Sequence, residues 1–105
     1  MELPEISAQD AAARQKAGSI LLDVREPFEL GIASVKGTLN IPMNQVPDRL
    51  AEIPQDREIL CMCHHGGRSA AVGEFLLSKG YPKVLNLTGG IASWSAEVDP
   101  SVPQY

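Results

Sequence analysis

Short apolar runs that alternate with helical patterns are the feature that most constrains the fold of this chain. Three runs of strand length, residues 20–24, 58–63 and 84–87, consist mainly of apolar residues. A strand reads as a nearly continuous apolar run when both of its faces are buried, which is typical of a parallel sheet covered by helices. The sequence therefore predicts an α/β fold with helices on both faces of a parallel sheet.

The segments between these runs carry helix signals. Ser7 precedes an alanine-rich stretch with an acidic first turn and a closing glycine, which predicts an N-capped helix over 8–18. Val46, Leu50 and Ile53 are spaced like one face of a helix and predict a second α-helix over 46–53. We expect further helices at 26–30, 68–79 and 89–96, and a brief strand at 39–42.

Length and composition indicate one globular domain. The chain has 105 residues, of which 44% are apolar and 21% are charged, close to the average for soluble domains. We expect a single domain over residues 1–105, with its core at about 5–97. The remaining residues, 98–105, are too proline-rich to continue a helix and are expected to wrap over the core or hang free.

Charge and hydropathy argue against two classes of partner. The net charge of −4 disfavours nucleic acid and an anionic membrane as the main partner. No stretch approaches the roughly 18 apolar residues of a membrane span, and the first residues do not resemble a secretory signal. The expected location is the cytoplasm, with no nucleic-acid and no membrane partner.

The two cysteines, Cys61 and Cys63, are predicted to have different roles. They are so close that a disulfide between them would close a small, strained ring, and it could not link distant parts of the fold. Cys61 lies within an apolar run and is expected to be a small buried hydrophobic residue. Cys63 is followed by histidines, glycines and an arginine, which is the setting of a reactive thiol.

The segment 63–68 is predicted to bind an anion. It leads from a strand into a helix, on which Ala71, Phe75 and Leu76 are predicted to share one side. Ligand sites of open α/β sheets lie at the carboxyl ends of strands, and here two glycines would let several N–H groups turn inward beside a helix N-terminus. With Arg68 nearby, these donors would stabilise a thiolate and make Cys63 a nucleophile.

A metal site is the alternative for this cluster. Cys61, Cys63, His64 and His65 all carry potential ligands, but four ligands within five residues cannot easily surround one tetrahedral ion. No metal is therefore expected. The two histidines are interpreted as groups on the loop surface, because a thiolate that has already formed needs no base.

Four motifs resemble those of the rhodanese family, and the likeness runs from about Ser7 to Trp94. They are 22–29 (LDVREPFE), 37–42 (GTLNIP), 63–69 (CHHGGRS) and 87–94 (LTGGIASW). The resemblance implies a three-layer α/β/α fold with a central five-stranded, mostly parallel sheet. It also implies a thiosulfate sulfurtransferase that carries sulfur as a persulfide on Cys63 and needs no cofactor.

The resemblance further implies how substrates are held. The anion binders would be the backbone amides of the active loop and the Arg68 side chain, which involves His64, His65, Gly66, Gly67, Arg68 and Ser69. The donor would be thiosulfate or a similar small molecule, and the acceptor cyanide or a thiol, with a protein thiol as a further candidate.

Arg25, in the first motif, is expected to be structural or at the rim of the site, and it is a further candidate for contact with the substrate. Asp23 is interpreted as an internal hydrogen-bond acceptor. The stretch 33–37 departs from the usual Gly-His pair of the family. Specificity is expected to depend on residues around the active loop, namely Phe28, Ser34 and Lys36.

Two other functions are compatible with this fold. A related class of cysteine-dependent phosphatases has one more residue between cysteine and arginine, whereas only four residues separate Cys63 from Arg68. The tighter loop leaves less room for a phosphate and its leaving group. A non-catalytic binding or regulatory module is the second alternative, but such modules often lose the cysteine that this chain retains.

Overall fold

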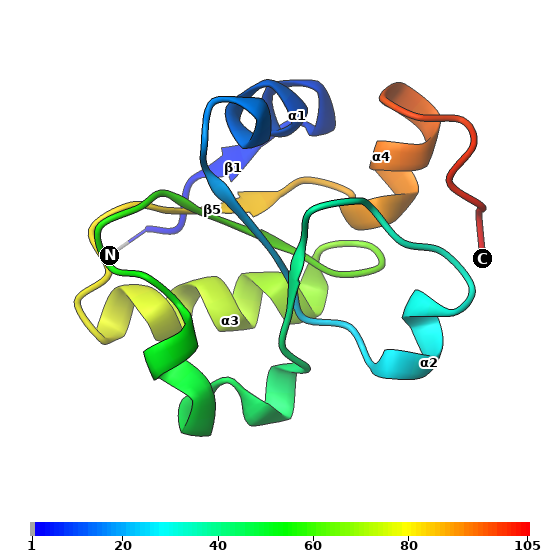
Figure 1. Ribbon diagram of the computed structural model, residues 1–105. Coiled ribbons are helices and arrows are strands. Elements are labelled where there is room, and N and C mark those ends of the chain that lie inside the picture. Colours follow the sequence, from blue (N-terminus) through cyan, green and yellow to red (C-terminus); the bar gives the residue numbers. More distant parts are fainter. Residues whose placement is uncertain (1) are drawn as a thin grey trace.

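A five-stranded parallel sheet forms the centre of the computed structural model, which describes residues 2–105 (Figure 1). In chain order the strands are β1 (Glu5–Ile6), β2 (Ile20–Asp23), β3 (Leu39–Asn40), β4 (Ile59–Met62) and β5 (Val84–Leu87). Their spatial order is β1-β5-β4-β2-β3, and every neighbouring pair is parallel. The predicted α/β fold is confirmed, with a sheet that is wholly parallel.

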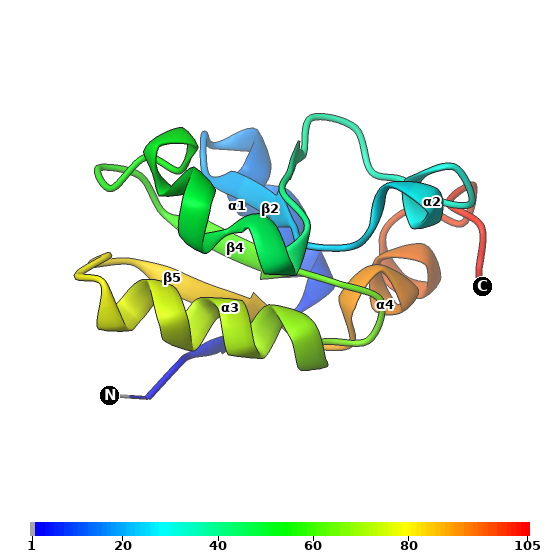
Figure 2. The ribbon, with the colours of Figure 1, turned by 90° about the horizontal axis from the view of Figure 1, so that it is seen from below.

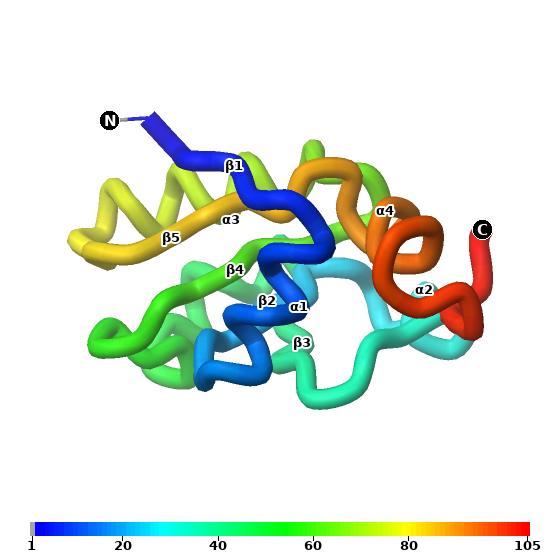
Figure 3. The backbone as a smooth tube through the Cα atoms, turned by 90° about the horizontal axis from the view of Figure 1, so that it is seen from above, coloured from blue at the N-terminus to red at the C-terminus, as the bar shows by residue number. Residues whose placement is uncertain are grey.

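Helices cover both faces of the sheet. α1 (Ala8–Lys16) and α4 (Gly90–Glu97) lie on one face, and α3 (Gly67–Ser78) lies on the other (Figures 1 and 2). Two 3-10 helices, η1 (Met43–Gln45) and η2 (Pro47–Glu52), lie on the same face as α3. The short α2 (Pro27–Leu30) lies beyond the carboxyl ends of the strands. The view from above shows α1 crossing over the sheet (Figure 3).

Each sheet face has its own apolar core, because neighbouring residues of a strand point to opposite faces. In β4, Leu60 and Met62 belong to the core under α1 and α4, whereas Ile59 and Cys61 belong to the core under α3. All four are completely buried. This two-sided burial explains why the strands read as continuous apolar runs in the sequence.

The helix predicted over 46–53 has a different backbone from the one expected. This segment is the 3-10 helix η2, and Arg49 interrupts it with φ −121° and ψ 23°. Val46 and Ile53 are nevertheless buried against the core, as their spacing indicated. The prediction of an α-helix was wrong because a kinked 3-10 segment satisfies the same apolar spacing over this short distance.

The buried face of α3 also differs from the predicted one. Of the three residues expected to share it, Leu76 is buried, Phe75 is half-buried and Ala71 is exposed. The buried stripe instead has the helical spacing i, i+3, i+4, i+7 and contains small and polar residues, namely Ser69, Val72, Gly73 and Leu76. The prediction missed Ser69 and Gly73 because they are not large and apolar.

The chain after α4 packs against the protein. Val102 is buried in the core under α1 and α4, and the Ser95 hydroxyl donates a hydrogen bond to the Val102 carbonyl at 2.6 Å. Residues 98–105, called the tail below, therefore wrap over the core, one of the two predicted arrangements. The tail brings Tyr105 beside α2, at the edge of the sheet where the strands end (Figures 1 and 3).

Candidate active site

The loop that follows β4 holds the predicted nucleophile. Cys63 is 1% exposed, and its Sγ accepts a hydrogen bond from the Gly66 N–H at 3.1 Å. Gly66 has a φ of 112°, a left-handed conformation that turns the loop back over the sulfur before α3 begins. The cradle of backbone amides predicted from the two glycines is therefore present around this sulfur.

The surroundings of Cys63 favour the thiolate. Burial raises the pKa of the Cys63 thiol, but hydrogen bonds from the loop, including those of the backbone amides of Ser69, Gly66 and His65, lower it by more. The result is a pKa below the ordinary value of a cysteine. The cysteine is thus prepared for nucleophilic attack by the loop that surrounds it.

The N-terminus of α4 fixes the same loop from the other side. The Ile91 N–H donates to the Cys63 carbonyl at 2.9 Å, and the Ala92 N–H donates to the His64 carbonyl at 3.2 Å. A side chain at Gly90 would collide with these two carbonyls. The motif 87–94 therefore has a clear structural role, because its glycine lets α4 approach and bind the active loop.

Arg68 forms a bidentate ion pair that the sequence analysis did not predict. Its Nη1 and Nη2 lie 2.7 and 2.9 Å from the two carboxylate oxygens of Glu29 on α2. The ion pair raises the pKa of Arg68 above its ordinary value. A guanidinium has five N–H groups, and Glu29 uses two of them. Within residues 2–105 the remaining three have no hydrogen-bond partner.

Glu29 is itself held in place by several donors. Arg68 is the main reason that the pKa of Glu29 falls to about 2, and the Glu26 amide and Tyr105 hydroxyl contribute further. The Glu26 N–H donates at 2.9 Å and closes a capping box at the start of α2. Glu29 is 5% exposed and remains ionised at neutral pH. The carboxylate therefore fixes the position of Arg68.

Tyr105 joins two ion pairs at this edge of the sheet. Its hydroxyl donates to Glu29 Oε1 at 2.9 Å and accepts a hydrogen bond from Arg25 Nη1 at 2.9 Å. Arg25 in turn pairs with Asp23, and Glu29 pairs with Arg68. The Tyr105 hydroxyl thus links the buried ion pair beneath the site, between Arg25 and Asp23, to the ion pair of Arg68 beside the active loop.

Three stacked rings border the active loop. The His64 ring lies between His65, at a centroid distance of 3.9 Å, and Tyr105, at 3.7 Å with an interplanar angle of 4°. Burial and the neighbouring His65 lower the pKa of His64. His64 is therefore an uncharged ring at neutral pH that packs the tail against the loop.

Asn86 supports the loop from below. It lies in β5 and is 3% exposed. Its Oδ1 accepts a hydrogen bond from the Ser69 hydroxyl at 2.6 Å, and its Nδ2 donates to the Gly66 carbonyl and to Glu5 Oε2, both at 3.1 Å. These contacts connect β1 and β5 to the residues around Cys63.

Arg25 does not contact the surface of the loop, where direct substrate contact was expected. It is completely buried, and its donors bond to the Asp23 carboxylate, the Ala33 carbonyl and the Tyr105 hydroxyl. To touch an anion, the guanidinium would have to leave these partners. In this structure Arg25 instead supports Glu29 through Tyr105, and Asp23 is the internal acceptor that was expected.

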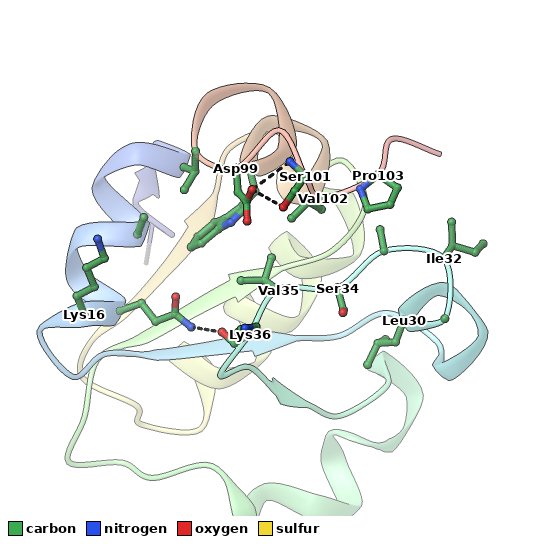
Figure 4. Close-up of a pocket in the computed structure, with 16 residues that line it drawn as sticks. Lys16, Leu30, Ile32, Ser34, Val35, Lys36, Asp99, Ser101, Val102 and Pro103 are labelled. Atoms are coloured by element: carbon green, nitrogen blue, oxygen red, sulfur yellow. Dashed lines mark hydrogen bonds between the residues drawn. The ribbon is translucent and has the colours of Figure 1, made fainter.

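A large hollow lies away from Cys63. This open cavity of about 620 Å³ lies between the loop 30–36, the tail and α1 (Figure 4). Ser34 and Lys36 line it, and no residue of the active loop does. Phe28 is 71% exposed on α2. Of the three residues expected to influence specificity, two therefore lie in a separate cavity rather than around the active loop.

The predicted loop residues come together as one unit, and three further residues join them. The structure adds Glu29, Asn86 and Tyr105 to the site. Asn86 had a signal in the sequence, since it is a lone polar residue in an apolar strand. Glu29 follows Glu26 and a proline at capping-box spacing. Nothing in the sequence indicated Tyr105.

Among residues 2–105 no three histidine, cysteine, aspartate or glutamate side chains converge as metal ligands would. Over the same range, the helices are too short or too polar to cross a membrane.

Comparison with known proteins gives the family. The fold and site define an α/β protein with a reactive-cysteine loop, and residues 7–97 match the rhodanese-like domain family. A thiosulfate sulfurtransferase of Tolumonas auensis, GlpE, is 34% identical over 94 residues, which cover 89% of each chain. This chain belongs to the rhodanese-like domain family.

Further relatives include a longer protein and a solved structure. The rhodanese-like/PpiC domain-containing protein 12, chloroplastic, of Arabidopsis thaliana is 42% identical over 89 residues, and the chain spans 30% of its length. The crystal structure of a rhodanese-related protein from Thermoplasma volcanium superposes with a TM-score of 0.84 at 38% identity, covering 90% of this chain and 93% of that one. The fold is thus shared over nearly the whole length of a similar protein.

Proposed function

We propose that this chain is a sulfurtransferase that moves a sulfane sulfur from thiosulfate, or a similar donor, to cyanide or a thiol by way of a persulfide on Cys63. The observation that carries the proposal is the position of Cys63 Sγ. It lies in a cradle of loop amides at the N-terminus of α3, with Arg68 at the sixth position of the loop. A thiosulfate sulfurtransferase among the relatives supports the choice of donor.

In the first half-reaction the Cys63 thiolate attacks the outer sulfur of thiosulfate. A new sulfur–sulfur bond forms on Cys63 as the sulfur–sulfur bond of thiosulfate breaks, and sulfite leaves with the bonding electron pair. The free N–H groups of Arg68 and the dipole of α3 offset the charge of the donor. The product is a Cys63 persulfide anion, whose outer sulfur is held by loop amides.

In the second half-reaction an acceptor nucleophile attacks the outer sulfur of the persulfide. The bond between the two sulfurs of the persulfide breaks, its electron pair returns to Cys63, and the thiolate is restored. With cyanide the product is thiocyanate, and with a thiolate it is a new persulfide. A small thiol and the thiol of an acceptor protein would react in the same way.

The spacing of the loop favours sulfur transfer over phosphate-ester hydrolysis. Only four residues separate Cys63 from Arg68, and the Arg68 guanidinium is paired with Glu29. A tetrahedral phosphate with its leaving group needs more room than the outer sulfur of thiosulfate.

The proposal is tested by steady-state assays with thiosulfate and cyanide. We expect thiocyanate to form with ping-pong kinetics, because sulfite leaves before the acceptor reacts. The same preparation should not hydrolyse p-nitrophenyl phosphate. Phosphate-ester hydrolysis that is lost in Cys63→Ser, without thiocyanate formation, would identify a phosphatase instead. Absence of both activities, together with no sulfur adduct on Cys63, would identify a non-catalytic module.

A further inference from the structure

The orientation of the Asn86 side chain is determined by its neighbours. One end of the amide faces the Gly66 carbonyl and the Glu5 carboxylate, each at 3.1 Å. Both groups only accept hydrogen bonds at neutral pH, so the amide nitrogen must be at this end. Asn86 Oδ1 therefore faces Ser69, and it too can only accept.

The Ser69 hydroxyl has one proton and three acceptors within reach. It lies 2.6 Å from Asn86 Oδ1, 3.2 Å from the Gly66 carbonyl oxygen and 3.4 Å from Cys63 Sγ. The contact with Asn86 has the length of a strong hydrogen bond between oxygens, and no other proton can occupy it. In the resting protein the Ser69 proton therefore points to Asn86, and a lone pair of the hydroxyl oxygen faces the sulfur.

We propose that Asn86 is a positioning residue of the sulfur-transfer site, which holds the Ser69 hydroxyl proton and thereby withholds that hydrogen bond from Cys63. The catalytic role of Asn86 rests on the proposed function, whereas the hydrogen-bond geometry around Ser69 does not depend on it. The loop amides can donate to the thiolate without breaking another hydrogen bond. The Ser69 hydroxyl can donate to the sulfur only if it breaks its hydrogen bond to Asn86. A thiolate that receives fewer hydrogen bonds is more basic and a stronger nucleophile.

Other groups around Cys63 do not compete for this proton. The charged or titratable groups that face the sulfur or its supports are Arg68 on α3, Glu29 on α2, Cys61 on β4, Glu5 on β1, and His64 and His65 on the loop. None of these groups forms a hydrogen bond with the Ser69 hydroxyl. Once Asn86 is removed, the acceptors left for this proton are the Gly66 carbonyl at 3.2 Å and the Cys63 sulfur at 3.4 Å. A charged thiolate is the stronger acceptor of the two, so removal of Asn86 should redirect the proton to the sulfur.

The experiment measures the thiolate of Cys63 directly by its absorbance near 240 nm across a pH series, with Cys63→Ser as the blank. Cys61 does not interfere, because burial raises its pKa to about 12. We expect Asn86→Leu to raise the thiolate fraction on the acidic side of the titration about fivefold, the equivalent of one ordinary hydrogen bond. Ser69→Ala should change it by less than about twofold, because the hydroxyl contributes little to the sulfur at rest.

Two further variants show whether the effect passes through Ser69. Combining Asn86→Leu with Ser69→Ala should remove the increase, since no hydroxyl remains to turn. Glu5→Gln is the matched control: it weakens one Asn86 contact but leaves the Gly66 carbonyl to fix the amide, so the thiolate fraction should not change. Circular dichroism and thermal melting confirm that each variant is folded.

The inference is overturned if Ser69→Ala alone lowers the thiolate fraction about fivefold, which would place the proton on the sulfur at rest. It is equally overturned if folded Asn86→Leu leaves the fraction unchanged. Should Asn86→Leu fail to fold, the Ser69→Ala result still decides. None of these measurements requires sulfur transfer, so failure of the proposed function would appear separately, as absence of thiocyanate.

Discussion

Cys61 and Cys63 lie two residues apart and have opposite chemical properties. Cys61 is inside β4, is completely buried among apolar side chains, and burial raises its pKa to about 12. Cys63 is just beyond the end of the strand and is buried almost as deeply, at 1% exposed, but its pKa is lowered. Burial alone therefore does not determine the reactivity of a cysteine in this protein.

The difference between the two comes from the backbone around each sulfur. In β4 the amides are used by the sheet, and the Cys61 sulfur lies in the apolar core under α3, where burial and the nearby Cys63 raise its pKa. Beyond the strand, the amides of the loop and of the first turn of α3 have no ladder partners and point at Cys63. The end of a parallel strand thus turns an inert thiol position into a reactive one.

The largest effect is expected from replacing each cysteine in turn. Cys63→Ser should reduce thiocyanate formation by more than about a thousandfold, because the hydroxyl of serine is not ionised and cannot carry the sulfur. Cys61→Ala should keep the activity and lose about 1–2 kcal/mol of unfolding free energy through the small cavity it leaves. Steady-state kinetics and urea unfolding measure the two quantities. A strong loss of activity in Cys61→Ala would contradict the assignment of roles.

Arg68→Ala should have the next largest effect. We expect kcat/KM for thiosulfate to fall about 10- to 100-fold, since charge-assisted hydrogen bonds contribute about 1.5–3 kcal/mol. The reaction of preformed persulfide with cyanide should change less, because no sulfonate group has to be held. Pre-steady-state measurement of the two half-reactions separates these effects. Unchanged kinetics with thiosulfate would mean that the loop amides alone hold the donor.

Glu29→Gln tests the ion pair through its pH dependence. The folded-state pKa of Glu29 is about 2 and the ordinary value is 4.5, so the stabilisation is complete above about pH 4.5 and is lost as the pH falls toward 2. At neutral pH we expect the variant to be about 2 kcal/mol less stable, after allowance for the partly exposed Arg68. Urea unfolding at several pH values measures this difference. A gap between the proteins that stays constant down to pH 2 would argue against the ion pair as its cause.

The smallest effect is expected from Tyr105→Phe. This change keeps the ring that stacks on His64 and removes the hydroxyl that joins Arg25 to Glu29. Loss of about one hydrogen bond should lower kcat/KM for thiosulfate up to about fivefold. Tyr105→Leu, which removes the stack as well, should do more. If the two variants behave alike, the hydroxyl rather than the ring is what matters.

Much of the fold could be predicted because the strands and helices carry local signals. The runs at 20–24, 58–63 and 84–87 are strands, and the capped segment after Ser7 is α1. β1 could not be found from the pattern, since a strand of two residues shows no period and is defined by its pairing with β5. Likewise, the kink at Arg49 within η2 depends on packing and not on the apolar spacing alone.

The part of the site that is contiguous in sequence could be predicted. The contacts between residues far apart in the sequence could not. The loop from Cys63 to Ser69 contains its own turn residues and helix start, so its shape followed from the chain itself. The partner of Arg68 is 39 residues away, and Tyr105 reaches Glu29 across 76 residues. Such contacts depend on how the sheet brings strand ends together. For the same reason the burial of Arg25 beneath the site could not be predicted from the chain alone.

Intact mass spectrometry after incubation with thiosulfate is the most direct test of the central claim that only Cys63 carries sulfur. The protein and Cys61→Ala should each gain one sulfur atom, peptide mapping should place it on Cys63, and cyanide should remove it. Cys63→Ser should gain none. A sulfur adduct that persists in Cys63→Ser, or that maps to Cys61, would contradict the claim.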